Sequence, residues 1–229
     1  MNPHLSVIAP VFTDEVHSVR YAAEVLGRSA EAAAGDNYEI LFADDGSAPC
    51  TRDALDALAR ADRRIRPIGD GRHYGLGRMF RWALEEARGE FALYTDGDGQ
   101  VACSELARVW PSRGDCDLVL GYRTGRREGL VRNAGTVALS FLASVFLGRR
   151  YQDVDCAFKF ARADFLRSLG LRCRGVGIDA EILLMARRRS ARILEIPVAH
   201  TPPRGRKSRV TPGRILYGAC EFLMSAMSR

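Results

Sequence analysis

Apolar runs and helical patterns alternate along the first half of the chain. Apolar segments that end in polar residues predict four strands, at residues 5–12, 38–47, 65–70 and 91–100. Apolar residues at helical spacing predict helices between them, at residues 16–34, 52–62 and 75–89, the last closed by Gly89. Strands separated by helices need crossover connections, so the pattern indicates an α/β fold class with a mostly parallel sheet.

Acidic residues follow three of the four predicted strands. They are Asp14 and Glu15, Asp44 and Asp45, and Asp96 and Asp98. Ligands of such sheets bind at the carboxyl ends of the strands, so we expect these acids to face one crevice. Clustered carboxylates repel one another unless cations or hydrogen-bond donors balance them. Nucleotides supply donors, and Mg²⁺ or Mn²⁺ binds carboxylates together with a diphosphate, so the pattern predicts a nucleotide site with a divalent metal.

The segment "FALYTDGDGQ" holds the closest pair of these acids. A strand places Asp96 and Asp98 on one face, as a metal clamp requires. A run of Asp-Gly pairs is also typical of a tight turn, and this alternative stays open. A calcium-binding EF-hand loop would need glycine and glutamate where Val101 and Ala107 stand, so that class is excluded.

Composition favours one globular domain over residues 1–229, because 47% of the residues are hydrophobic and 27% are charged. The six cysteines form no Cys-x-x-Cys pair, and no signal segment opens the chain, so we expect reduced thiols in a cytoplasmic protein. Charge divides the sequence: residues 1–115 carry 13 arginines against 19 acids, whereas residues 116–229 carry 21 basic residues against 9 acids. The second half therefore faces an anion, which a nucleic acid, an acidic membrane or a phosphorylated substrate would each provide; solvated helix faces are the alternative without function.

Two large classes of nucleotide-binding enzyme lack their motifs here. A dinucleotide-binding enzyme carries G-x-G-x-x-G after its first strand, and a P-loop enzyme carries G-x-x-x-x-G-K-[ST]. The first predicted strand is followed by "PVFTDE" instead. Both classes are disfavoured, and a nucleotidyltransferase, which also lacks its glycine-rich loop here, is a weaker alternative.

The acidic segments resemble motifs of the family-2 glycosyltransferases. "PVFTDE", "ADDGS" and "DGDGQ" are similar, in order, to the opening, nucleotide-binding and D-x-D-x-Q metal motifs of that family. Further along, "GYR", "DVDCAFKFARADFL", "DAEILLMARRRSARILEIPV" and "RGRKSRV" resemble the branch of dolichol-phosphate mannose synthase and bacterial polyprenyl-phosphate sugar transferases. The resemblance covers nearly the whole chain.

This resemblance implies a GT-A fold and a metal-dependent, inverting transfer. The donor would be a GDP- or UDP-linked hexose or N-acetylhexosamine, and the acceptor a dolichyl or undecaprenyl phosphate. Residues 1–115 would form the nucleotide-binding half and residues 116–229 the acceptor-side half, with a basic loop. The same machinery acting on a soluble acceptor, such as a nucleoside or a natural-product intermediate, is the alternative. A nucleic-acid-binding module is the alternative from another class, but no aromatic-interleaved basic motif or zinc spacing supports it, so no nucleic-acid partner is expected.

The resemblance also implies roles for individual residues. Pro10 and Val11 would line the base pocket, with Asp14 in place of the usual glutamate. Other residues implied for the nucleotide sugar are Asp44, Asp45, Ser47, Asp96, Arg123, Arg204, Ser208 and Arg209. The metal ligands would be Asp96, Asp98 and Gln100, and Asp98 would count as catalytic. The chain departs from the family pattern at His73, where asparagine is usual, and at Gly97, where alanine is common.

Basic residues of the second half fit the phosphates of donor and acceptor. Arg204 and Ser208 match the R-x-x-x-S spacing of the family that the chain resembles, and a guanidinium holds two phosphate oxygens at once, so the resemblance makes Arg204 a catalytic candidate. Arg206 and Lys207 are equally explained as surface charge. The residues implied for the acceptor are Arg132, Asp153 and Glu181.

Two of these acceptor residues have structural alternatives. Asp153 would orient the acceptor or act as a base, and a turn-capping aspartate is the alternative. Glu181 lies near the start of a predicted helix, where the helix dipole alone favours an acid. Asp155 is a weaker candidate than Asp153, and Lys159 is interpreted as a packing or surface residue.

One segment bears on membrane contact. Residues 133–148 carry no charge over 16 positions, fewer than the roughly 20 apolar residues of a spanning helix. A core helix and an interfacial helix flanked by arginines both fit this pattern. Relatives often continue into transmembrane helices, whereas this sequence ends at "EFLMSAMSR". We therefore expect a cytoplasmic protein that is either peripheral at the inner face of the cytoplasmic membrane or fully soluble.

Overall fold

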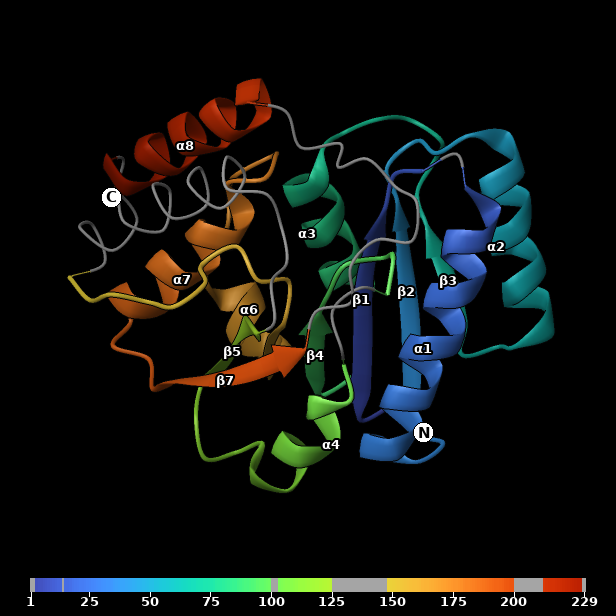
Figure 1. The fold of residues 1–229 in the computed structure, drawn as a ribbon, viewed down its shortest axis with the longest axis horizontal. Helices are drawn as coiled ribbons and strands as arrows, with labels where there is room; N and C mark the ends of the chain where they lie inside the picture. Colours follow the sequence, from blue (N-terminus) through green and yellow to red (C-terminus); the bar gives the residue numbers. More distant parts are fainter. Residues whose placement is uncertain (1–2, 14, 100–102, 125–147, 200–211, 228–229) are drawn as a thin grey trace.

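Seven strands form one central sheet in the computed structural model, which describes residues 3–13, 15–99, 103–124, 148–199 and 212–227. Their order across the sheet is β3-β2-β1-β4-β6-β5-β7 (Figure 1). The strands are β1 (Leu5–Val11), β2 (Tyr38–Asp44), β3 (Ile65–Ile68), β4 (Phe91–Tyr94), β5 (Leu118–Thr124), β6 (Lys159–Arg162) and β7 (Ile193–Ala199). All neighbouring pairs are parallel except those of β6, which runs antiparallel to both β4 and β5. The predicted α/β class with a mostly parallel sheet is confirmed.

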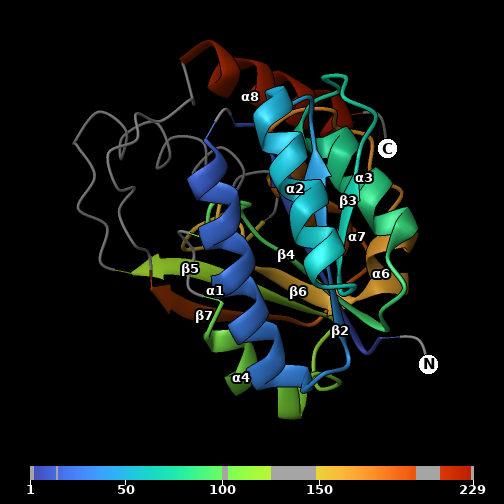
Figure 2. The ribbon, with the colours of Figure 1, turned by 90° about the vertical axis from the view of Figure 1, so that its right-hand side faces the viewer.

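Helices cover both faces of the sheet. They are α1 (Val16–Ala34), α2 (Pro49–Ala61), α3 (Leu76–Glu86), α4 (Glu105–Val109), α6 (Ala163–Ser168), α7 (Ile178–Arg188) and α8 (Pro212–Met227), with a 3₁₀ turn, η1, at Trp110–Ser112. One apolar cluster joins α1, α2 and α4 to one face of the sheet, and another joins α3, α6 and α7 to the other (Figure 2). Strands that are covered on both faces read as continuous apolar runs, which is why β1, β2 and β4 were recognisable from the sequence.

The predicted strands end earlier than their apolar runs suggested. β2 ends at Asp44 and β4 ends at Tyr94, so the polar residues that follow them lie in loops at the carboxyl ends of the strands. The prediction that Gly89 closes a helix is wrong, because α3 ends at Glu86 and Ala87 is already extended. Gly89 instead passes against β1, where an added Cβ would lie 2.5 Å from the Ser6 nitrogen.

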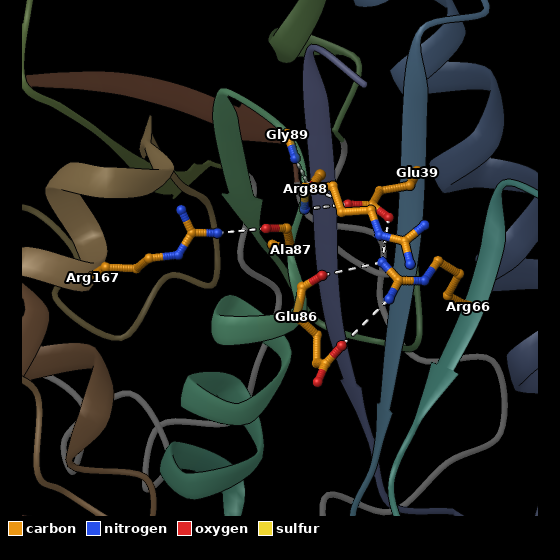
Figure 3. A network of polar contacts seen from close by, with 8 residues as sticks. Glu39, Arg66, Glu86, Ala87, Arg88, Gly89 and Arg167 are labelled. Carbon is orange, nitrogen blue, oxygen red and sulfur yellow. Dashed lines mark hydrogen bonds and ion pairs between the residues drawn. The ribbon is translucent and has the colours of Figure 1, made fainter. Parts of the chain in front are cut away.

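Charged side chains hold the opposite edge of the sheet together (Figure 3). Glu39 of β2 is buried; its carboxylate accepts hydrogen bonds from the Ser6 hydroxyl (2.7 Å), the Arg88 backbone N–H (2.7 Å) and the Arg66 guanidinium (2.6 Å). Arg66 and Arg167 also donate to carbonyls at the end of α3, which helix geometry leaves without partners. This network fixes the carboxyl end of α3 from β2, β3 and α6.

The described strands of both sequence halves belong to the same sheet, β1–β4 from residues 1–115 and β5–β7 from residues 116–229. The division into a nucleotide-binding and an acceptor-side half stays a prediction. Within the described ranges, no helix has the length and apolarity needed to cross a membrane. The uncharged segment 133–148 lies outside these ranges apart from Gly148.

Candidate active site

The loop after β4 carries two predicted metal ligands to the end of β1. The Thr95 N–H donates to the Ile8 carbonyl (3.0 Å), which keeps the chain beside β1 as it leaves the sheet. Gly97 then packs so closely on the Pro10 carbonyl that any side chain would collide, and Gly99 has a φ of +70°. The loop therefore needs both glycines to place Asp96 and Asp98 beside Pro10.

Asp96 and Asp98 are half-buried and share excess negative charge. Burial, together with the negative charges of Asp98 and Asp179, raises the pKa of Asp96 to about 7. Carboxylate oxygens are the ligands that Mg²⁺ and Mn²⁺ prefer, and a cation would relieve this repulsion, so the pair fits such a metal. Among the described residues no group of three or more His, Cys, Asp or Glu side chains surrounds a metal position. Other ligands would therefore come from a diphosphate or water, and the predicted ligand Gln100 lies outside the described residues.

The ends of β1 and β2 are joined by the predicted nucleotide-binding residues. The Asp45 N–H donates to the Val11 carbonyl (2.8 Å), and the Thr13 N–H donates to the Ser47 hydroxyl (3.1 Å). The Ser47 N–H in turn donates to the Asp44 carboxylate (2.9 Å). Asp44 and Ser47 thus organise the loops that flank Pro10, while their contacts to a base and ribose stay a prediction.

Asp45 holds the segment that leads into α3. Its buried carboxylate accepts hydrogen bonds from the Tyr74 and Gly75 N–H groups and lies 3.0 Å from His73 Nδ1. The His73 ring lies 4.8 Å, between centroids, from that of Phe12, which is 38% exposed. Asp45 therefore couples the ends of β1 and β2 to the start of α3.

Arg123 of β5 and Asp153 bind each other. Two hydrogen bonds join the guanidinium to the carboxylate, from Nε to Oδ2 (2.7 Å) and from Nη2 to Oδ1 (2.9 Å), and both side chains are nearly buried. Burial acts to lower the pKa of Arg123, but its bonds to Asp153 raise it above the ordinary value, so the guanidinium is charged. The sequence predicted these residues for the phosphates and the acceptor, respectively; the structure brings them together.

A buried lysine beside the end of β4 excludes the surface alternative for this residue and leaves the packing one. Lys159 is fully buried on β6, so it is not a surface residue, and its ammonium donates to the Asp179 carboxylate and the Cys156 carbonyl (2.7 Å). Asp155 lies nearby; burial raises its pKa to about 6, assisted by the charges of Asp179 and Asp153. A lysine within the apolar run "CAFKFA" was the available signal, because a charge in a buried strand needs a partner.

Glu181 of α7 has structural contacts. Its fully buried carboxylate accepts hydrogen bonds from the Arg172 and Cys173 N–H groups. The same loop is held by Glu221 of α8, which accepts from the Arg174 and Gly175 N–H groups. An acceptor contact for Glu181 stays a prediction.

Several predicted site residues fall outside the described ranges. They are Asp14, Gln100, Arg132, Arg204, Ser208 and Arg209. Of the remaining predicted residues, those at the ends of β1, β2 and β4 meet at one edge of the sheet.

Comparison with known sequences places most of this fold in one family. The model of "Glycosyl transferase family 2" matches residues 6–166. The chain is 26% identical over 187 residues to the undecaprenyl-phosphate mannosyltransferase of Micrococcus luteus, with 76% of each chain covered. It is 26% identical over 191 residues to the dolichyl-phosphate beta-glucosyltransferase of Saccharomyces cerevisiae, which covers 72% of this chain and 57% of that protein.

Solved structures share the fold at lower identity. Glucosyl-3-phosphoglycerate synthase from Mycobacterium tuberculosis, in complex with Mn²⁺ and UDP-glucose, aligns with a TM-score of 0.71 at 16% identity, covering 99% of this chain and 79% of that one. The mannosyltransferase PcManGT from Pyrobaculum calidifontis, in complex with GDP-mannose and Mn²⁺, aligns with a TM-score of 0.64 at 17% identity, covering 100% and 64%. These likenesses establish the predicted GT-A fold.

Proposed function

The chain belongs to glycosyl transferase family 2, and we propose that it transfers a hexose or N-acetylhexosamine from GDP or UDP to a polyprenyl phosphate, with inversion. The observation that carries this proposal is the meeting of Asp96 and Asp98 with the Pro10 end of β1 at the carboxyl edge of the sheet. Relatives named for undecaprenyl-phosphate and dolichyl-phosphate acceptors support the choice of acceptor.

Asp96, Asp98 and Gln100 would hold Mg²⁺ or Mn²⁺. Once bound, such a cation neutralises the charge that develops on the leaving diphosphate without a proton donor. Pro10, Val11, Asp14, Asp44 and Ser47 would position the nucleoside, because the loops after β1 and β2 are tied together at that place. The donor would then be oriented by residues at the ends of three strands, β1, β2 and β4.

The acceptor needs little help from a base. A phosphate monoester is already largely ionised near neutral pH, so the enzyme must position it rather than deprotonate it. Asp153, fixed by Arg123, would orient the acceptor, and Arg132 and Arg204 would bind its phosphate and that of the donor. In this proposal the protein is cytoplasmic and meets its lipid acceptor at the inner face of the membrane.

A product assay tests the proposal. Purified protein is incubated with GDP- and UDP-sugars, Mn²⁺ and either a short-chain polyprenyl phosphate or a panel of nucleosides and other soluble acceptors, and products are identified by mass spectrometry. We expect a glycosyl phosphate product with the polyprenyl acceptor that disappears with EDTA. Products formed only with soluble acceptors would replace the lipid acceptor with the alternative, and donor turnover that is unaffected by EDTA would overturn the metal assignment.

A further inference from the structure

Lys159 lies beside the end of β4, the strand that precedes the predicted metal ligands. On β6 it pairs directly with Tyr94, the last residue of β4, and its ammonium lies 5.6 Å from the centre of the Tyr94 ring. Asp96 follows Tyr94 by two residues. The Asp179 carboxylate binds Lys159, and its charge contributes, after burial, to raising the pKa of Tyr94. The Lys159–Asp179 pair therefore lies beside the end of β4, two residues before the first predicted metal ligand.

Charge in this region is unevenly distributed. Five carboxylates and two cations interact here: Asp96, Asp98, Asp153, Asp155 and Asp179 with Arg123 and Lys159. Arg123 is committed to Asp153 by a two-point contact. Among the described residues, Lys159 is thus the cation in contact with Asp179, and the charge of Arg123 makes a smaller contribution. Without it, a third charge would add to those of Asp96 and Asp98.

We propose, as an inference that rests on the proposed function, that the Lys159–Asp179 ion pair borders the metal site without adding net charge to it. We call this pair the balanced floor, in which Lys159 is a positioning residue. Lys159 holds Asp179 in place and cancels its charge, so the negative charge offered to a divalent cation comes from Asp96 and Asp98. Burial raises the pKa of Asp179, and the charge of Lys159 and its hydrogen bond oppose that rise.

A purely structural ion pair is the competing explanation. Buried pairs are often replaceable by apolar residues without loss of stability, whereas removing one partner leaves an uncompensated charge. The two explanations differ in one measurable quantity. A structural pair affects stability alone, whereas a balanced floor affects the affinity for the cation in a direction set by the charge that is removed.

Three variants separate these explanations. Asp179→Asn keeps nearly the same shape and removes one negative charge, and the double variant Lys159→Met/Asp179→Asn removes both charges. Arg66→Met is the matched control, because it breaks the ion pair with buried Glu39 at the opposite edge of the sheet. Each protein is titrated with Mn²⁺ alone, with free Mn²⁺ followed by electron paramagnetic resonance, and its unfolding in urea is recorded.

We expect Asp179→Asn to weaken Mn²⁺ binding about tenfold, equivalent to about 1.4 kcal/mol, because Lys159 is then unbalanced. The double variant should return to within about twofold of the unmodified protein, and Arg66→Met should lose stability with no change in Mn²⁺ affinity. Unchanged affinity in Asp179→Asn would overturn the proposal, as would a loss that the double variant does not restore, since Asp179 would then bind the cation itself. Absence of Mn²⁺ binding to the unmodified protein would overturn it too.

A parallel titration keeps this result distinct from the proposed function. GDP and UDP are titrated into the unmodified protein with Mn²⁺ and with EDTA. If the restored Mn²⁺ affinity is observed but neither nucleotide binds, the floor stands and the donor assignment falls. If a nucleotide binds with Mn²⁺ but the charge order of the variants fails, the donor site stands and the balanced floor falls.

Discussion

Asp98 is a single residue whose negative charge is unfavourable in the free protein and would become favourable with a bound metal ion. It lies two residues from Asp96, and its charge helps raise the pKa of Asp96. Such repulsion is unfavourable in the free protein, and under the proposed function a divalent cation held by Asp96 and Asp98 would relieve it. Residues of this kind are kept for function rather than for stability.

We predict that Asp98→Asn separates these two effects. Transfer should fall by about 10²–10³-fold, because one group that stabilises charge at the reacting centre is lost. The free energy of unfolding without metal should change by no more than about 1 kcal/mol, since the substitution is nearly isosteric and also removes a repulsion. Initial rates and urea unfolding measure the two quantities. Near-normal turnover by the folded variant would refute the metal assignment of Asp98.

Residue types and spacing identified the acids at the strand ends, because each follows an apolar run whose period is visible in the sequence. Partners of those acids were not visible. Arg123 and Asp153 were assigned to different ligands, yet they bind each other across 30 positions of sequence. Lys159 was interpreted as packing or surface, yet it binds the Asp179 carboxylate 20 positions away. Such pairs depend on how β5, β6 and α7 meet, which local patterns do not specify.

Helix α3 is an element that is held at both ends, each at a different end of the sheet. Asp45 holds the segment before its start at the candidate active site, while Glu39, Arg66 and Arg167 fix its end at the opposite edge (Figure 3). The amphipathic pattern predicted the helix itself. Its end was misplaced because the close approach of Gly89 to β1, rather than a helix cap, determines the chain path.

We predict that Glu39→Ala destabilises the protein without affecting the site. The loss of unfolding free energy should be about 3–5 kcal/mol, because Arg66, the Ser6 hydroxyl and the Arg88 N–H lose a shared buried acceptor. Glu86→Ala is the control; Glu86 is half-exposed and lies 3.5 Å from Arg66, so its loss should remain within about 0.5 kcal/mol. Urea unfolding measures both. Equal effects of the two variants would contradict the assigned role of Glu39, as would altered nucleotide affinity in folded Glu39→Ala.

In the whole molecule, sequence patterns predict the strands of the first half but not the arrangement of the strands in the second half. The alternation of strands and helices in the sequence predicted β1 to β4 and a mostly parallel sheet. The second half departs from alternation, because β6 enters antiparallel between β4 and β5 and its short run Lys159–Arg162 has no distinctive period. That insertion places Lys159 beside Tyr94 at the end of β4. The resemblance to a family, rather than the pattern, indicated a GT-A fold.

We predict, finally, that metal and nucleoside diphosphate bind as a unit. The described residues offer Asp96 and Asp98 but no group of three metal-binding side chains, so the remaining ligands would come from the diphosphate, Gln100 and water. Each ligand should then tighten the other by about 5–150-fold, and thermodynamic linkage requires the two factors to be equal. In a thermal-shift panel of GDP, UDP and other nucleoside diphosphates, one nucleotide should stabilise the protein with Mn²⁺ by about 2.7 kcal/mol at 100 times its dissociation constant. The shift should fall sharply with EDTA. Nucleotide affinity that is the same with Mn²⁺ and with EDTA would show that the base and ribose contacts alone hold the donor, and the carboxylates at the end of β4 would then need another role.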